Sequence, residues 1–144
     1  MDVQQLIYSI KNKEIVVPEF QREYVWPYKN AKDLFKSLLN EFPVGGILIW
    51  KTSTPPALKG IKEEELGNFQ RVYQVLLDGQ QRMTVIYMLA TGEIPPYYVK
   101  SEIAADPRKL CFNLHTRDFQ YHTKSMEEDQ SWQYVKEILL GKVS

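Results

Sequence analysis

Residues 72–84 read VYQVLLDGQQRMT, and this stretch predicts the junction around which the fold is organised. Its apolar run, Val72–Leu77, is typical of a buried strand. Gly79 can adopt a positive φ and so permits a sharp turn. The apolar residues that follow recur at helical spacing and predict a helix over residues 80–91, which Gly92 ends. The sequence therefore predicts a strand, a tight turn and a helix in direct succession.

The rest of the chain alternates between helical and strand patterns. The predicted helices cover residues 2–10, 28–41 and 132–140, the last one capped by Ser131, and the predicted strands cover residues 14–18, 47–50, 110–114 and 119–121. We expect the strand 47–50 to be buried. Residues 52–70 contain prolines, glycines and an acidic cluster, which predict a mobile loop. This order predicts one α+β domain over residues 1–144, with a small mixed sheet packed with helices, and we expect it to be the N-terminal domain of a longer protein.

Two finer predictions concern which side chains face the core. On the helix 80–91, these are Met83, Ile86, Tyr87 and Ala90. In the strand 110–114, the apolar Leu110, Phe112 and Leu114 alternate with Cys111 and Asn113, which predicts a half-buried strand. Its hairpin partner is expected to carry Phe119 and Tyr121.

The composition limits the classes of function. The chain has 144 residues, enough for one ordinary domain, and its 18 Lys and Arg residues balance 18 Asp and Glu residues. A protein that holds DNA by itself usually carries an excess of basic residues, since phosphate contacts supply most of the affinity. No apolar run approaches the roughly 20 residues that a bilayer-spanning helix needs, so we expect no membrane partner. Cys111 is the single cysteine, which excludes an internal disulfide and suits a reducing cytoplasm.

The start of the predicted helix 80–91 has the features of an anion site. The first N–H groups of a helix lack intrahelical partners and, with the helix dipole, attract negative charge. Arg82 lies in this first turn, where the dipole disfavours a cation by about 0.3–1 kcal/mol. A phosphate held between the guanidinium and the amides of Gln80 and Gln81 would reverse that cost, and arginine is well shaped for bidentate phosphate contacts. In the alternative interpretation, Asp78 merely caps the helix and Arg82 pairs with a surface carboxylate.

A second polar island lies upstream, at Gln21 and Arg22. Arg22 would add a phosphate contact, and an aromatic neighbour would stack on a base; the candidates are Phe20, Tyr24 and Trp26. Each of these aromatic residues, taken singly, is more often part of the core or its rim. Gly45 and Gly46 would let the backbone approach a ligand closely, or would simply end the preceding helix.

Other catalytic chemistries find little support. His115 and His122 have no Cys, Asp or Glu partners at metal-ligand spacing, so we expect no metal site built from protein ligands. The sequence has no serine nucleophile elbow and no phosphate-binding loop of the GxxxxGK[ST] type. Cys111 precedes His115 by four residues, but a buried thiol on a strand is the more ordinary interpretation than a Cys–His pair.

Three segments taken in order carry a family resemblance: VVPEFQREYVW at residues 16–26, FPVGGILIW at residues 42–50 and YQVLLDGQQRMTVIYML at residues 73–89. The chain resembles the N-terminal domain of GmrSD-type, modification-dependent restriction proteins, known as domain of unknown function family 262. The resemblance runs from about Leu6 to the final helix. It implies a ParB/sulfiredoxin-like fold, a small α/β unit with a nucleotide pocket.

The resemblance also implies a site for a nucleoside triphosphate with Mg²⁺ at the DGQQR segment. Carried over residue by residue, it implies that Asp78 and Arg82 act in hydrolysis and that the nucleotide contacts are Gln21, Arg22, Gly45, Gly46, Gly79, Gln80, Gln81 and Thr84. Val85 stands where the family often has a threonine, which would weaken hydrolysis if that hydroxyl touches phosphate or metal. Gln80 stands where sulfiredoxins have their catalytic cysteine, so sulfiredoxin chemistry is excluded.

Three functions stay open at this point. The first is an NTP-binding, or NTP-hydrolysing, regulatory domain of a phage-defence restriction system, which controls a nuclease in a C-terminal domain or a partner subunit. Family members often carry an HNH-type nuclease there; this chain lacks such a histidine cluster, so we expect no DNA cleavage by this domain alone and DNA contact only through the full-length protein. The second is a ParB-like DNA-binding or nicking module. The third is a protein-interaction domain in which DGQQR is purely structural.

Overall fold

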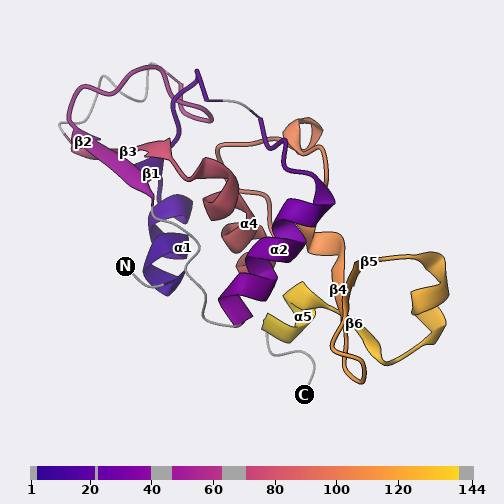
Figure 1. The fold of residues 1–144 in the computed structure, drawn as a ribbon. Helices are drawn as coiled ribbons and strands as arrows, with labels where there is room; N and C mark the ends of the chain where they lie inside the picture. The colour runs from indigo at the N-terminus through magenta and orange to yellow at the C-terminus, as the bar shows by residue number, and fades with distance from the viewer. Residues whose placement is uncertain (1–2, 22, 40–46, 63–70, 140–144) are drawn as a thin grey trace.

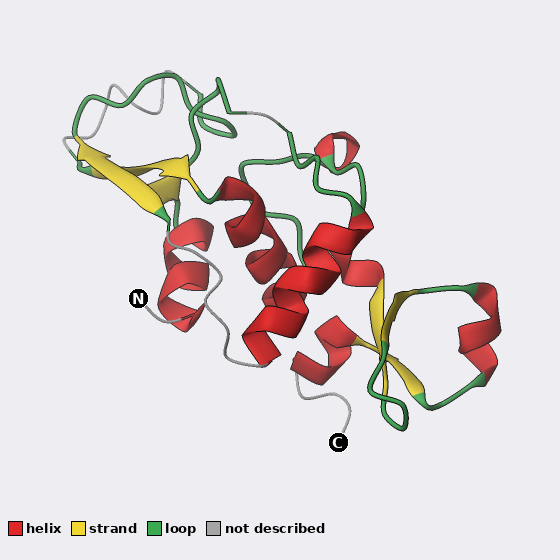
Figure 2. Ribbon diagram, viewed as in Figure 1, coloured by secondary structure: helices red, strands yellow, loops and turns green. Residues whose placement is uncertain are grey.

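A computed structural model describes residues 3–21, 23–39, 47–62 and 71–139 (Figure 1). Two small sheets lie at opposite ends of the molecule, and the helices lie between them (Figure 2). The predicted α+β class, a small mixed sheet packed with helices, is therefore confirmed. Within the described ranges, no helix combines the length and apolar character that crossing a membrane requires.

The elements follow one another in a mixed order. The helices are α1 (Val3–Lys11), α2 (Tyr28–Leu39), α4 (Gln80–Thr91) and α5 (Val135–Leu139), with short 3₁₀ turns η1 (Lys100–Glu102), η2 (Pro107–Lys109) and η3 (Lys124–Glu128). The strands are β1 (Ile15–Val16), β2 (Leu48–Thr52), β3 (Tyr73–Asp78), β4 (Leu110–Asn113), β5 (Phe119–Tyr121) and β6 (Trp132–Tyr134). The predicted extension of α2 to residue 41 and the predicted cap at Asp2 lie outside the described residues.

The first sheet has the order β1-β3-β2, and its strand β3 ends at the first residue of the DGQQR segment. Strand β3 lies in the middle, parallel to β1 and antiparallel to β2. Its central residues Val75 and Leu76 are fully buried. The register with β2 shifts between Leu48 and Ile49, next to the last residue of β3, Asp78. The sheet therefore becomes irregular at the point where β3 ends and the turn begins.

Helix α4 is the central helix and contacts α1, α2, α5 and η2. Its predicted core residues Met83 and Tyr87 are buried, whereas Ile86 and Ala90 are only half-buried. The prediction of a single core face was wrong, because packing on several sides also buries Thr84, Val85, Met88 and Leu89. Gly92 ends the helix in the left-handed conformation, with φ 73° and its N–H bonded to the Met88 carbonyl, as predicted.

The second sheet has the order β5-β4-β6, with both pairings antiparallel. The hairpin of β4 and β5 was predicted, but the last helix was not predicted correctly. Residues 132–134 form strand β6 rather than the first helical turn, and α5 begins only at Val135. Trp132 and Tyr134 are strand-favouring residues that pair with Asn113 and Cys111. Ladder pairing with β4 therefore outweighs the helical spacing of the segment.

Two burial predictions for strands are also wrong. Strand β2 is exposed at Leu48 and Trp50, with 58% and 45% of each residue accessible, and it lies at the edge of its sheet. A short apolar run does not distinguish a central strand from such an edge. In β4, Cys111 and Asn113 are buried while Leu114 is exposed. The Asn113 side chain instead accepts the amides of the turn residues 115 and 116, which explains a buried polar residue there.

The predicted loop 52–70 is described as far as residue 62. Beyond the end of β2 this part has no regular strand or helix, but Leu58 is only 3% exposed. The Lys59 amide donates to the Val17 carbonyl at 2.8 Å, and the Glu19 amide donates to the Ala57 carbonyl at 2.9 Å. These contacts attach the middle of the loop to the chain that follows β1. Mobility of the loop stays a prediction, and residues 63–70 lie outside the described residues.

Hydrogen exchange measured by NMR will locate the mobile part of this loop. We expect slow exchange at the amides of Lys59 and Glu19, because each donates to a backbone carbonyl beside the buried Leu58. The amide of Thr54 bonds only to the exposed side chain of Thr52 and should exchange much faster. Equally fast exchange at Lys59 and Thr54 would show that the anchor at Leu58 does not persist.

Gly79 offers a second test of the fold. Its φ of 93° is left-handed, and a Cβ built on it would approach Ile47 Cγ2 to 2.5 Å. We expect Gly79→Ala to lower the free energy of unfolding by the roughly 1–2 kcal/mol of left-handed strain plus the cost of this clash. Gly92→Ala, at φ 73°, carries the same kind of backbone strain and serves as the matched control. Chemical denaturation of both variants measures the difference.

Adding Ile47→Ala to Gly79→Ala removes the clashing methyl group. The double variant should recover part of the stability that Gly79→Ala loses in excess of Gly92→Ala. Equal losses for the two glycine variants, with no recovery in the double variant, would contradict the packing of Ile47 against this turn.

Candidate functional site

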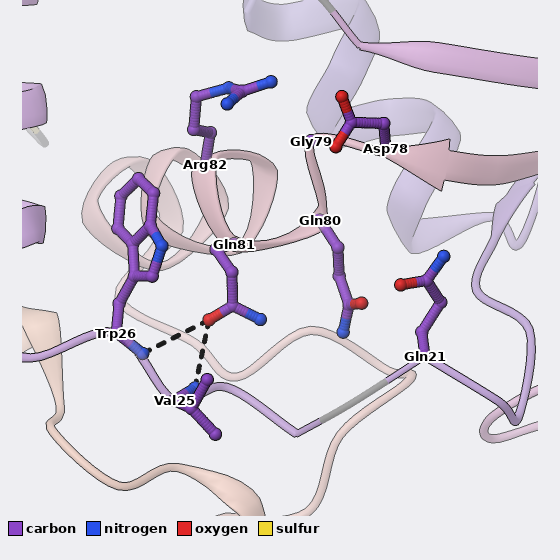
Figure 3. Close-up of a pocket in the computed structure, with 8 residues that line it drawn as sticks. All are labelled: Gln21, Val25, Trp26, Asp78, Gly79, Gln80, Gln81 and Arg82. Atoms are coloured by element: carbon purple, nitrogen blue, oxygen red, sulfur yellow. Dashed lines mark hydrogen bonds between the residues drawn. The ribbon is translucent and has the colours of Figure 1, made fainter.

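A pocket of about 290 Å³ opens where β3 passes into α4 (Figure 3). The residues that line it come from two segments far apart in the sequence: Gln21, Val25, Trp26, Asp78, Gly79, Gln80, Gln81 and Arg82. The prediction that the DGQQR segment forms a strand-to-helix turn beside a concave surface is confirmed. The upstream FQR…W segment supplies the opposite wall.

The turn itself exposes the start of α4. Gly79 is the N-cap of the helix, and its carbonyl accepts the first intrahelical hydrogen bond, from Met83 N at 2.9 Å. Having no side chain, Gly79 supplies no capping oxygen to the first-turn amides. Asp78, the helix cap of the alternative interpretation, precedes the N-cap position and is the exposed last residue of β3. The positive end of the helix dipole is thus directed at the pocket without a side-chain cap from Gly79.

Gln81 joins the two walls of the pocket. Its side-chain oxygen accepts hydrogen bonds from the amides of Val25, at 3.0 Å, and Trp26, at 3.3 Å, as Figure 3 shows. Its side-chain nitrogen donates to the Glu23 carbonyl at 3.1 Å. Gln21 makes a contact in the opposite direction, donating to the Leu77 carbonyl at 3.1 Å. Each glutamine therefore holds the backbone of the other segment.

Gln80 and Thr84 project toward the interior. Gln80 is only 5% exposed, and its side-chain nitrogen donates to the hydroxyl of Tyr98. Thr84 is fully buried, and its hydroxyl is 2.9 Å from the hydroxyl of Tyr97. Burial raises the pKa of both tyrosines well above the usual range, so both hydroxyls are neutral at physiological pH. Gln80 lines the pocket, but Thr84 lies outside it.

Asp78 and Arg82 lie together on another side of the turn. Figure 3 shows their side chains on the side of Gly79 away from those of Gln80 and Gln81. A Cβ on Gly79 would lie 3.3 Å from Arg82 Nη2, so the guanidinium extends over the turn. Asp78 is exposed and Arg82 is half-buried, which leaves both accessible from the pocket.

The structure brings most, but not all, of the predicted site residues together. Gln21, Asp78, Gly79, Gln80, Gln81 and Arg82 share the pocket. Arg22, Gly45 and Gly46 lie outside the described residues. Of the three aromatic candidates, Trp26 lines the pocket, Tyr24 is fully buried and Phe20 is 72% exposed.

Sequence reasoning missed Tyr97 and Tyr98, which hold the inner side of α4. They follow two prolines, in a segment without helical or strand spacing, so no periodicity marked them as buried. Two consecutive large residues that are both 5% exposed occur only where the backbone itself is enclosed. The sole local signal was the pair of tyrosines itself, in a part of the chain that otherwise predicts a loop.

Metal and thiol chemistry find no site in the part of the chain that the structure describes. No group of three or more His, Cys, Asp or Glu residues there has the arrangement of a metal site. Burial raises the pKa of the Cys111 thiol to about 11, so the reactive thiolate is scarce at neutral pH. His122 lies stacked on Tyr134, 3.9 Å from the Glu127 carboxylate, which accounts for it structurally.

Comparison with known proteins gives a family match and a relative of similar sequence. The sequence matches the family described as "GmrSD restriction endonuclease, N-terminal domain" over residues 3–143. An uncharacterized protein of Methanocaldococcus jannaschii is 32% identical over 141 residues, an alignment that covers 85% of this chain and 24% of that protein. The chain thus spans about a quarter of the length of this relative, and no solved structure gives a significant match. Because the family match extends over nearly the whole chain and includes both walls of the pocket, this protein belongs to the GmrSD restriction endonuclease N-terminal domain family.

Proposed function

We propose that this domain binds a nucleoside triphosphate in the pocket between β3 and α4, and that nucleotide binding regulates a restriction nuclease. The observation that carries the proposal is the start of α4, whose N-cap is a glycine without a capping side chain, beside a pocket that Arg82 also lines. A helix start attracts anions through its first-turn amides and its dipole. The guanidinium adds a charged, bidentate donor at the same place.

The phosphates would lie beside the turn. In this arrangement the first-turn amides and Arg82 contact phosphate oxygens, and Asp78 lies on the same side as Arg82. Among the described residues that line the pocket, Asp78 alone carries a carboxylate. Mg²⁺ is commonly bound by one or two carboxylates together with substrate phosphates, so Asp78 and the nucleotide would hold it jointly. In hydrolysis, Asp78 would position a water molecule near the terminal phosphate.

The base would lie toward the upstream wall. Trp26 lines this side of the pocket, half-buried, with its backbone held by Gln81. An indole face offers a stacking surface that accepts any base, since every base has a π-face. The pocket alone therefore supports nucleotide binding without selecting among the four bases.

The description of the family and the greater length of the relative support the regulatory role. The family is described as the N-terminal domain of a restriction endonuclease, and this chain covers 24% of the length of its relative from Methanocaldococcus jannaschii. A longer protein of that kind has room for a nuclease domain. Nucleotide state at the turn would then control a nuclease that lies elsewhere in the full-length protein or in a partner, as part of defence against phage DNA.

Substitution of Arg82 tests the proposal. Arg82→Ala removes a cation that the helix dipole does not favour, so the melting temperature of the nucleotide-free domain reports on the other contacts of Arg82. The same change removes a charge-assisted phosphate contact worth about 1.5–3 kcal/mol, or roughly ten- to a hundredfold in affinity. Titration calorimetry with ATP, GTP, CTP and UTP in the presence of Mg²⁺, together with thermal melts, measures both effects.

Arg108 provides a matched contrast. Its guanidinium contacts both Asp106 oxygens, at 2.8–3.1 Å, and the Gly92 carbonyl at 3.1 Å. Arg108→Ala should therefore lower the melting temperature without weakening nucleotide binding. The proposal fails if no nucleotide binds the wild type, or if Arg82→Ala leaves the Kd for nucleotide unchanged. Either result would favour a purely structural DGQQR segment, for which Gln81 already gives an example.

A further inference from the structure

Two consecutive tyrosines bind neighbouring turns of α4, but only one of them reaches the pocket. Tyr98 accepts a hydrogen bond from Gln80, which lines the pocket, and Tyr97 contacts Thr84, which does not. Gln80 and Thr84 are four residues apart, so the two contacts lie on one side of the helix. Both tyrosines are 5% exposed. The pair therefore offers two similar buried contacts that differ mainly in their distance from the candidate site.

The hydroxyl of Tyr98 also reaches beyond Gln80. Burial raises the pKa of Tyr98, and hydrogen bonding from the side chains of Gln80 and Gln81 lowers it, so both glutamine amides of DGQQR lie near this hydroxyl. Gln81 in turn holds the backbone of residues 23–26. Tyr98 thus touches the inner wall of the pocket directly and is connected to the opposite wall through one side chain.

Lys59 and Glu102 contact Tyr98 and the residue that follows it. Lys59 Nζ lies 5.5 Å from the centroid of the Tyr98 ring and 3.3 Å from a carboxylate oxygen of Glu102. The other Glu102 oxygen accepts the amide of Val99 at 3.0 Å. The Lys59 and Glu102 side chains are 13% and 24% exposed, so this support is largely shielded from water. The ring of Tyr98 and the backbone that follows it are therefore fixed before any ligand binds.

We propose that Tyr98 is a positioning residue of the nucleotide site, whose hydroxyl orients the side chains of Gln80 and Gln81 and, through Gln81, the wall formed by residues 23–26. The inference rests on the proposed nucleotide binding for its functional part. Tyr98 touches no phosphate or base in this scheme. It acts by restricting two flexible carboxamides to one orientation, which lowers the ordering cost when a ligand enters.

Tyr97→Phe is the matched control for Tyr98→Phe. Both changes remove one buried hydroxyl from adjacent residues of equal exposure; Tyr97→Phe releases Thr84, and Tyr98→Phe releases Gln80 and Gln81 of the same helix. We expect the two variants to lose similar amounts of melting temperature. Tyr98→Phe should raise the Kd for nucleotide by about five- to tenfold, the effect of one lost hydrogen bond, while Tyr97→Phe should leave it within about twofold. Calorimetry uses whichever of ATP, GTP, CTP and UTP, with Mg²⁺, binds the wild type most tightly.

A double-substitution cycle separates positioning from general loosening. If Tyr98 acts through Gln80 and Gln81, then Tyr98→Phe should have little further effect on the Kd once both glutamines are replaced by alanine. A merely destabilising change would weaken binding to the same degree in both backgrounds. An unchanged Kd for Tyr98→Phe, equal shifts for both tyrosine variants, or full additivity in the cycle would each overturn the inference.

A measurement without nucleotide keeps this inference distinct from the proposed function. The amides of Val25 and Trp26 donate to Gln81, and their hydrogen exchange reports on how well that side chain is held. Tyr98→Phe should accelerate exchange at both amides, and Tyr97→Phe should not. If the wild type binds no nucleotide, the proposed function fails, yet this exchange result still decides the positioning role. Unchanged exchange at Val25 and Trp26 in Tyr98→Phe would overturn it.

Discussion

The carboxamide of Gln81 is the contact on which the arrangement of the candidate site depends. It accepts two backbone amides and donates to one carbonyl, all within residues 23–26. That segment has no regular hydrogen-bonded neighbours of its own over most of its length, so a side chain takes the place of a strand partner. A carboxylate in place of the amide would lack the donor, and asparagine would be one methylene shorter. Few side chains other than glutamine meet this combination of reach, donor and acceptor.

This contact divides the DGQQR segment by role. Gln80 and Gln81 are directed toward the tyrosines and the upstream segment, and they are engaged in protein contacts. Asp78 and Arg82 lie on another side of the turn, where they border the pocket. A single short motif thus contains two adjacent scaffold residues between two candidate ligand-binding residues. The left-handed Gly79 makes this division geometrically feasible, because it reverses the chain within one residue.

How much of the structure could be predicted from the sequence depends on how far apart along the chain the interacting residues lie. The strand, turn and helix around Gly79 depend on local spacing and backbone preference, and they were predicted almost to the residue. The family resemblance was predicted too and is confirmed, while the ParB/sulfiredoxin relationship of the fold stays a prediction. The exposed edge position of β2 and the strand at residues 132–134 depend on which partner each segment finds, which local spacing does not encode. The contacts of Gln81 and Tyr98 link residues 17 to 58 positions apart, and their partners have no pattern of their own.

The edge position of β2 has a consequence for how the isolated domain behaves in solution. Among the described residues, one side of this strand has no ladder partner. The strand also carries the exposed residues Leu48 and Trp50. Such an edge is a template for pairing between chains, and a lysine in the strand, here Lys51, works against that pairing. The net charge of zero at pH 7 adds no general repulsion between molecules. Acetylation of Lys51, or its reaction with another lysine-modifying reagent, would remove the charge that opposes pairing at this edge.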